Sequence, residues 1–287
     1  EIMPSLVGSE MCIRDRLDLT ANRYTLTEMP PEWNRGATVF VIGDDIAELK
    51  TIPTTSPNAT QRLNATVVVT QDGKAALHFK ATLKGISSWL LRRMMEEKGR
   101  RKERIENSLN EKIANFRLKN LRLPDLKDVL SSPFVWEIEG EATGFVAKTA
   151  EGYGIKPLPL SRKWSDELTG LQTRKLPLAL PAALPRAENS QIQPIPYLCV
   201  PGTCDEQWLY RLKGFKIKSL PEDLSVETPF VSASIKFSKK SETEVEVTRR
   251  VTFKTNWVPL KGYAQLRDAL AKLDRHLRRF IILKKAK

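Results

Sequence analysis

The clearest alternation of hydrophobic and polar positions lies between residues 63 and 83. Apolar residues occupy every second position from Leu63 to Val69 and again from Ala75 to Leu83. Such alternation predicts strands with one face on a core and the other in water. Between the two runs lies Asp72-Gly73, a pair that tolerates the positive φ angles of tight hairpin turns. We therefore predict a β-hairpin over residues 63–83.

Helical periodicity follows this hairpin and recurs near the end of the chain. Apolar residues at helical spacing form two short stripes, Ile86, Leu90 and Met94, then Ile105, Leu109, Ile113 and Phe116. A third stripe runs from Tyr263 to Leu277. Because the positions between the stripes are largely polar or charged, we predict two helices lying on a sheet and a C-terminal amphipathic helix.

Shorter alternating runs predict further strands at 134–139, 231–237 and 245–253. In the last run Arg249-Arg250 interrupts the apolar residues, and we interpret this as a β-bulge. Residues 157–201 are rich in proline, which predicts edge strands and extended connections rather than central strands. The predicted fold is mainly β with α (α+β): antiparallel, sandwich-like sheets with a two-helix insertion and a C-terminal helix.

Composition and charge narrow the class of protein. The chain has 287 residues, of which 41% are hydrophobic, enough for a substantial core. The sequence contains no apolar stretch of about 18 residues, so it predicts no transmembrane helix. The net charge of +13 favours anionic partners in general, but it also favours solubility, which is the interpretation we prefer.

A cluster of basic side chains falls on the predicted helix pair. Its members are Arg92, Arg93, Arg100, Arg101, Lys102 and Arg104. It is either a basic patch that grips phosphates or a solvated helical face with interspersed glutamates. We favour the solvated face and do not expect a nucleic-acid partner, because no nucleic-acid-binding motif accompanies the cluster.

The candidate chemistry is sparse. Cys199 and Cys204 flank a Pro-Gly turn, so a disulfide between them and two buried free thiols are equally compatible with the sequence. The only histidines are His78 and His276, which we interpret as surface residues, and no metal site is expected. No glycine-rich phosphate loop is present, and no cofactor is expected.

Several segments carry a resemblance to a known family. They are Leu17-Asp18-Leu19-Thr20, Met29-Pro30-Pro31, residues 36–42, the hairpin at 64–83 with its arginine-rich helix, and Tyr263-x-x-Leu266-Arg267. Together they resemble the C-terminal portion of bacterial transglutaminase-like proteins. In that family a papain-fold domain is followed by a β-rich C-terminal module. Residues 5–16 resemble a translated sequencing adapter, so residues 1–16 are expected to be non-native.

The resemblance implies a domain plan and a role. Residues 17–36 would be the end of a truncated transglutaminase-like domain, and 37–287 a β-rich module, either undivided or split into two sub-domains near 157–201. Asp18 matches the orienting Asp of a Cys-His-Asp triad whose other members would lie upstream; in isolation it is a turn or capping residue.

The function expected from the resemblance is that of a non-catalytic accessory or interaction module in the periplasm or cell envelope. Its partner would be the absent papain-like domain or another protein. The alternative is a basic module that binds nucleic acid or another polyanion.

Overall fold

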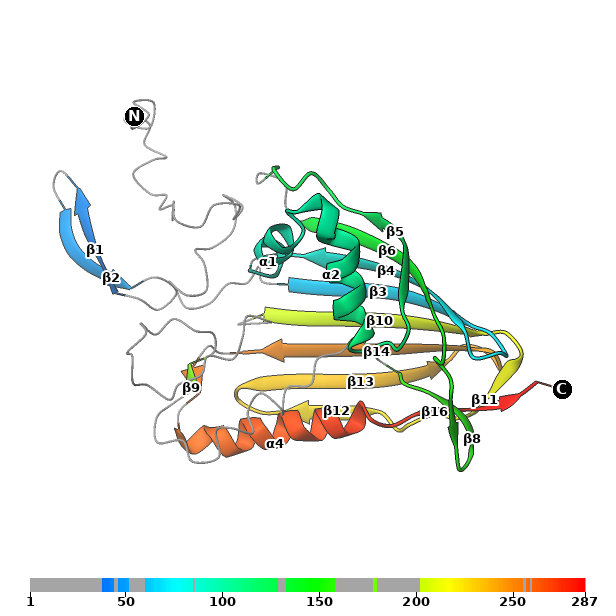
Figure 1. Ribbon diagram of the computed structural model, residues 1–287. Helices are drawn as coiled ribbons and strands as arrows, with labels where there is room; N and C mark the ends of the chain where they lie inside the picture. The colour runs from blue at the N-terminus through cyan, green and yellow to red at the C-terminus, as the bar shows by residue number, and fades with distance from the viewer. Residues whose placement is uncertain are drawn as a thin grey trace.

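A computed structural model of the protein describes residues 38–43, 46–51, 60–84, 86–128, 133–157, 160, 178–179, 202–254, 257–258 and 260–286. Its main element is an eight-stranded sheet (Figure 1). In spatial order its strands are β12 (Leu224–Glu227), β13 (Val231–Lys239), β14 (Glu244–Phe253), β10 (Gly202–Leu212), β3 (Thr60–Val69), β4 (Ala75–Leu83), β6 (Phe134–Ala142) and β5 (Arg117–Arg122).

One pair of strands joins the two halves of this sheet. β10 and β3 run parallel, whereas every other neighbouring pair in the sheet is antiparallel. The strands before and after the proline-rich stretch therefore share one sheet. The limits of the predicted sub-domains fall largely outside the described residues, and that division stays a prediction.

The predicted hairpin is present as β3 and β4. Its turn contains Gly73 at φ +82°, in the left-handed region that favours glycine. Hydrogen bonds from Lys74 and from the Thr70 hydroxyl lower the pKa of Asp72 to about 2. The turn is thus held by side chains as well as by its backbone.

Helices cover one face of the sheet, which we call the inner face. Figure 1 shows α1 (Ile86–Met94) and α2 (Arg101–Asn110) near β3–β6, and α4 (Leu260–His276) along β12 and β13. A short 3-10 helix, η3 (Lys98–Arg100), joins α1 to α2. None of the helices among the described residues is long and apolar enough to span a membrane.

Smaller sheets complete the fold. At one end lies a four-stranded sheet in the order β11 (Phe215–Ser219), β16 (Ile281–Lys285), β8 (Gly152–Ile155) and β7 (Ala147–Thr149). Two strand pairs stand apart from it, β1 (Thr38–Gly43) with β2 (Ile46–Thr51), and β9 (Leu178–Ala179) with β15 (Trp257–Val258). The prediction of a mainly β fold with few helices is confirmed.

Among the described residues one hydrophobic cluster joins the large sheet, its helices and most of the four-stranded sheet. At its centre Trp208 stacks on Tyr210, with ring centroids 6.2 Å apart, and meets the edge of Phe79 at 5.5 Å. The Tyr210 hydroxyl donates to the carbonyl of Pro157 at 2.6 Å. Burial raises the pKa of Tyr210, so this hydroxyl remains a donor. The aromatic centre thereby fixes the chain that leads into the proline-rich stretch.

The structure corrects two expectations about helices. Near the end of α1, Leu91 is buried, as is Met95 just beyond the helix, while Met94 is 40% exposed, so the predicted stripe is wrong at Met94; the burial of Ile86 and Leu90 lies outside what the structure describes. His276 was expected at the surface but is buried at the end of α4, against the ring of Phe237. The stripe of α2 is confirmed, since Ile105 and Leu109 are both buried.

Candidate binding site on the outer face of the sheet

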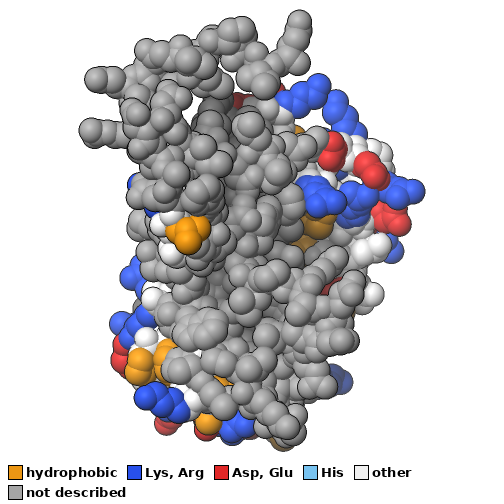
Figure 2. Space-filling view, turned by 90° about the vertical axis from the view of Figure 1, so that its left-hand side faces the viewer, with side chains coloured by type: hydrophobic (Ala, Val, Ile, Leu, Met, Phe, Trp, Pro, Cys, Tyr) orange, Lys and Arg blue, Asp and Glu red, His pale blue; other side chains and the backbone are white. Residues whose placement is uncertain are grey.

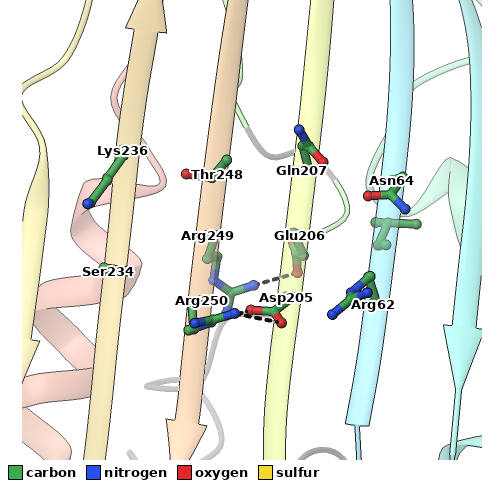
Figure 3. A pocket seen from close by; sticks show the side chains of 11 residues that line it. Arg62, Asn64, Asp205, Glu206, Gln207, Ser234, Lys236, Thr248, Arg249 and Arg250 are labelled. Atoms are coloured by element: carbon green, nitrogen blue, oxygen red, sulfur yellow. Dashed lines mark hydrogen bonds and ion pairs between the residues drawn. The ribbon is translucent and has the colours of Figure 1, made fainter.

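The face of the sheet opposite the helices carries a polar hollow of about 390 Å³. Figure 3 shows it over four adjacent strands, β13, β14, β10 and β3. Eleven described residues line it: Arg62, Leu63, Asn64, Asp205, Glu206, Gln207, Ser234, Lys236, Thr248, Arg249 and Arg250. No aromatic side chain is found among these described lining residues.

The strand register arranges these residues in rows. Lys236, Thr248, Gln207 and Asn64 are partners across the four strands. Ser234, Arg250, Asp205 and Arg62 form a second row, two residues away along each strand. Because alternate residues of a strand share a face, both rows lie on the outer face. The row between them, which contains Arg249, Glu206 and Leu63, belongs to the inner face.

The central carboxylate of the outer rows is neutralised. Arg250 donates from Nε and Nη2 to the two carboxylate oxygens of Asp205, at 2.6 and 3.2 Å. This bidentate contact raises the pKa of Arg250. Gln207 donates to Glu246 at 2.5 Å, and Lys240 with Gln207 lowers the pKa of Glu246. These contacts tie β10 to β14 across the floor of the hollow.

Two cations at the margins of the hollow stand apart from this network. Arg62 and Lys236 are exposed, and neither has a hydrogen-bond or ion-pair partner within the ranges that the structure describes. The lining contains four Arg or Lys side chains against two acidic ones. The hollow is therefore a site of positive potential, rich in hydrogen-bond donors and hydroxyl groups.

Beneath the hollow lies a buried ion pair on the inner face. Arg249 Nη1 donates to Glu206 Oε1 at 2.7 Å, and the side chains are only 2% and 13% exposed. Arg249 Nε and Nη2 have no hydrogen-bond partner among the described residues. A guanidinium in this position is unusual, because burying a charge is costly unless it is paired.

The β-bulge expected at Arg249-Arg250 is absent, because β14 keeps a continuous register with both neighbouring strands. Arg249 instead occupies the same inward phase as the buried Val247 and Val251. The sequence interpretation therefore missed an inward arginine. The sequence did contain an indication of it. Arg249 stands in the middle of an alternating apolar run, and an acidic partner, Glu206, is present in another segment of the chain.

The predicted basic patch is not one exposed surface. Arg92 is 1% exposed and donates to the carbonyls of Asp125 and Asp128 at 3.3 and 2.9 Å, so its inclusion in a surface patch was wrong. It also lies 4.9 Å above the ring of Phe134. Arg92 thus fastens the loop after β5 to α1, a structural role that periodicity did not reveal.

The other members of the patch surround the turn between α1 and α2. Arg101 and Arg104 donate to the carbonyls of Met95 and Met94, at 2.6 and 2.7 Å, and Arg104 and Arg100 pair with Glu97. The remaining members, Arg93 and Lys102, are exposed. Figure 2 shows basic and acidic side chains interspersed in the upper right, where α1 and α2 lie. This arrangement is closer to a solvated face than to a phosphate-binding patch.

An apolar groove of about 900 Å³ lies on the inner face beside α1 and α2. Its described lining includes Leu63, Leu91, Met94 and Trp136, with Glu206 among its polar members. Leu160 also lines the groove, and its carbonyl accepts a hydrogen bond from Lys112 Nζ at 3.1 Å. The Glu206 of the buried pair therefore also borders the groove.

The remaining predicted site residues are distributed as follows. Asp18 and Cys199 lie outside the described residues. Cys204 is disulfide-bonded, and its pairing with Cys199 stays a prediction. His78 is exposed on the outer face of β4, as expected. No group of three or more His, Cys, Asp or Glu that could hold a metal ion occurs among the described residues.

Among the comparisons with known proteins, one gives a match. No curated protein matches the chain, and no solved structure matches it. Residues 198–283 match the family described as "Domain of Unknown Function with solved-structure structure (DUF3858)". This segment contains β10–β14 and α4, and thus three of the four strands that form the hollow. Residues 198–283 of this chain are accordingly similar to the DUF3858 family.

Proposed function

We propose that this chain is a non-catalytic, β-rich accessory module of a bacterial transglutaminase-like protein of the cell envelope. The observation that carries the proposal is the DUF3858 match over residues 198–283, because that family is associated with transglutaminase-like proteins. The segments at 17–42 and 64–83 resemble the same class of protein independently. In this proposal the partner is the papain-like domain that would precede the module.

The sheet supports a module larger than the matched segment. Within that segment β10 takes β3 as its parallel neighbour, and β16 pairs with β8. Both outside strands lie between residues 60 and 155. The matched segment therefore needs these earlier strands to complete its sheets, and the proposed module comprises both.

Two further features fit this role. The groove beside α1 offers apolar surface, including the 40% exposed Met94, of the kind that protein contacts cover. The disulfide bond of Cys204 suits an oxidising compartment such as the periplasm. Neither feature requires catalytic groups within the module.

The first test is the genomic DNA upstream of Leu17. We expect it to encode a transglutaminase-like domain with a catalytic Cys and His, followed without interruption by the present sequence. If the upstream DNA encodes no such domain, the proposal fails.

A second test measures the interdomain contact. The upstream domain and the module would be produced separately, and their binding measured by calorimetry. We expect Met94→Glu to weaken binding, because it places a charge in the groove, whereas Leu49→Glu, at a position that is 71% exposed on β2, would serve as control. The accessory role would be contradicted if the separate native domains do not bind each other and if, in the full-length protein, neither domain protects the other from protease.

A further inference from the structure

The outer hollow carries an inference that is independent of the proposed accessory role. Its carboxylate, Asp205, is already engaged by Arg250. The groups that remain are the cations of Arg62 and Lys236 and the amide or hydroxyl groups of Asn64, Ser234 and Thr248. A ligand that fits must therefore be anionic and must also offer hydrogen-bonding groups between its charges.

The separation of the two cations sets the size of the ligand. Arg62 on β3 and Lys236 on β13 stand at opposite corners of the two rows, three strand spacings and two residues apart. With about 4.8 Å between strands and about 3.4 Å per residue, their Cα atoms are about 16 Å apart. Figure 3 shows the Lys236 side chain pointing away from Arg62, so one small anion does not span the two corners. The ligand should be an extended polymer with repeated negative charges.

The character of the surface distinguishes among polyanions. Single-stranded nucleic acid depends on aromatic side chains for base stacking, and the described lining has none. An extended peptide needs partners for its main-chain groups, which a sheet edge supplies and a sheet face does not. Sugar hydroxyls can instead pair with the Asn64, Ser234 and Thr248 side chains.

We propose that the outer hollow binds an acidic polysaccharide, with Arg62 and Lys236 contacting anionic groups on sugar units about 16 Å apart and the polar side chains between them contacting hydroxyl groups. The chemistry required of the ligand is a carboxylate on a repeating, hydroxyl-rich chain. Arg250 holds the floor of this site through its pair with Asp205.

The proposal can be tested with the whole chain and polygalacturonate as the probe, by calorimetry at low ionic strength. Arg62→Gln and Lys236→Gln should each weaken binding about fivefold, as loss of one exposed charge contact does. The two changes together should weaken it about 25-fold, because distant sites are additive. Lys272→Gln and Arg275→Gln, exposed positions on α4, remove the same charges elsewhere and should have less than a twofold effect.

Three comparison probes decide the class of ligand. Poly-L-glutamate, single-stranded DNA and uncharged dextran should each bind more weakly than polygalacturonate. Equal or tighter binding of the peptide or the DNA would overturn the polysaccharide assignment. Absence of polygalacturonate binding, or equal losses in the outer and α4 variants, would overturn the site itself. Since both outer residues are exposed, circular dichroism should show that all the variants remain folded.

Discussion

The buried pair of Arg249 and Glu206 permits a sharp test of the sheet register. Replacing Arg249 by Met keeps an unbranched, apolar stem, although a shorter one, and removes the guanidinium from Glu206. Both side chains are largely buried, at 2% and 13% exposure, so the Glu206 carboxylate loses its charged partner in a poorly solvated position. Breaking such a pair costs about 3 kcal/mol or more, which corresponds to a fall in Tm of about 6–12 °C.

Arg250 provides the matched control. It is the next residue on the same strand, it pairs with Asp205 in the next row, and its side chain is 66% exposed. Because solvent screens this outer pair, Arg250→Met should cost only about 0.5 kcal/mol. A double variant, Arg249→Met with Glu206→Met, should recover to within about 1 kcal/mol of the native protein, since a hydrophobic pair replaces both buried charges.

The assay is urea unfolding followed by tryptophan fluorescence, with Trp208 in the same inward phase of β10 as Glu206. Equal losses for Arg249→Met and Arg250→Met would refute the assignment of the two arginines to opposite faces. A double variant as unstable as Arg249→Met alone would refute the view that loss of the Arg249 contact to Glu206 is the cause.

Three further outcomes follow from the structure. Burial lowers the pKa of His276, so as pH falls below 6.5 the unfolded chain binds a proton that the folded chain does not. The free energy of unfolding should therefore decrease as pH falls, and His276→Phe should flatten that decrease in urea titrations between about pH 8 and 5. Gly140→Ala places a Cβ 2.3 Å from Phe116 Cζ and should cost about 2–3 kcal/mol in the same assay. Arg92→Met releases carbonyls of the loop after β5 and should accelerate tryptic cleavage after Lys127.

Each of these has a control of its own type. His78→Phe, at an exposed position on the outer face of β4, serves as the control for the loss of an imidazole as such. Gly99→Ala meets nothing within 4 Å and should be close to neutral. Arg93→Met, at an exposed position, should not alter cleavage after Lys127. Similar effects in a variant and its control would contradict the explanation in question.

The sequence predicted those parts of the fold that depend on neighbouring residues. The β3–β4 hairpin follows from alternation and from Asp72-Gly73, all within 24 residues of chain. The buried face of α2 likewise follows from its own periodicity. Local patterns suffice in these elements because their partners are adjacent in sequence.

Other features depend on partners that periodicity cannot identify. An arginine in an apolar phase indicates either a bulge or an ion pair, and only the pairing of β14 with β10 places Glu206 opposite Arg249. Likewise, Arg92 lies on a helix among other basic residues, yet its acceptors lie 33 to 36 residues away in sequence. The hollow could not be predicted for the same reason, since its four strands meet only in the complete sheet.

The parallel pairing of β3 with β10 also constrains the order of events during synthesis. β3 leaves the ribosome more than 130 residues before β10 does. Until β10 has been synthesised, the backbone N–H and C=O groups on that edge of β3 lack their hydrogen-bond partners. Strands with open edges readily pair with other chains, and distant pairings form slowly. The first half of the sheet therefore has an interval of aggregation risk during translation, in which a chaperone that shields the open edge of β3 would increase the yield of folded protein.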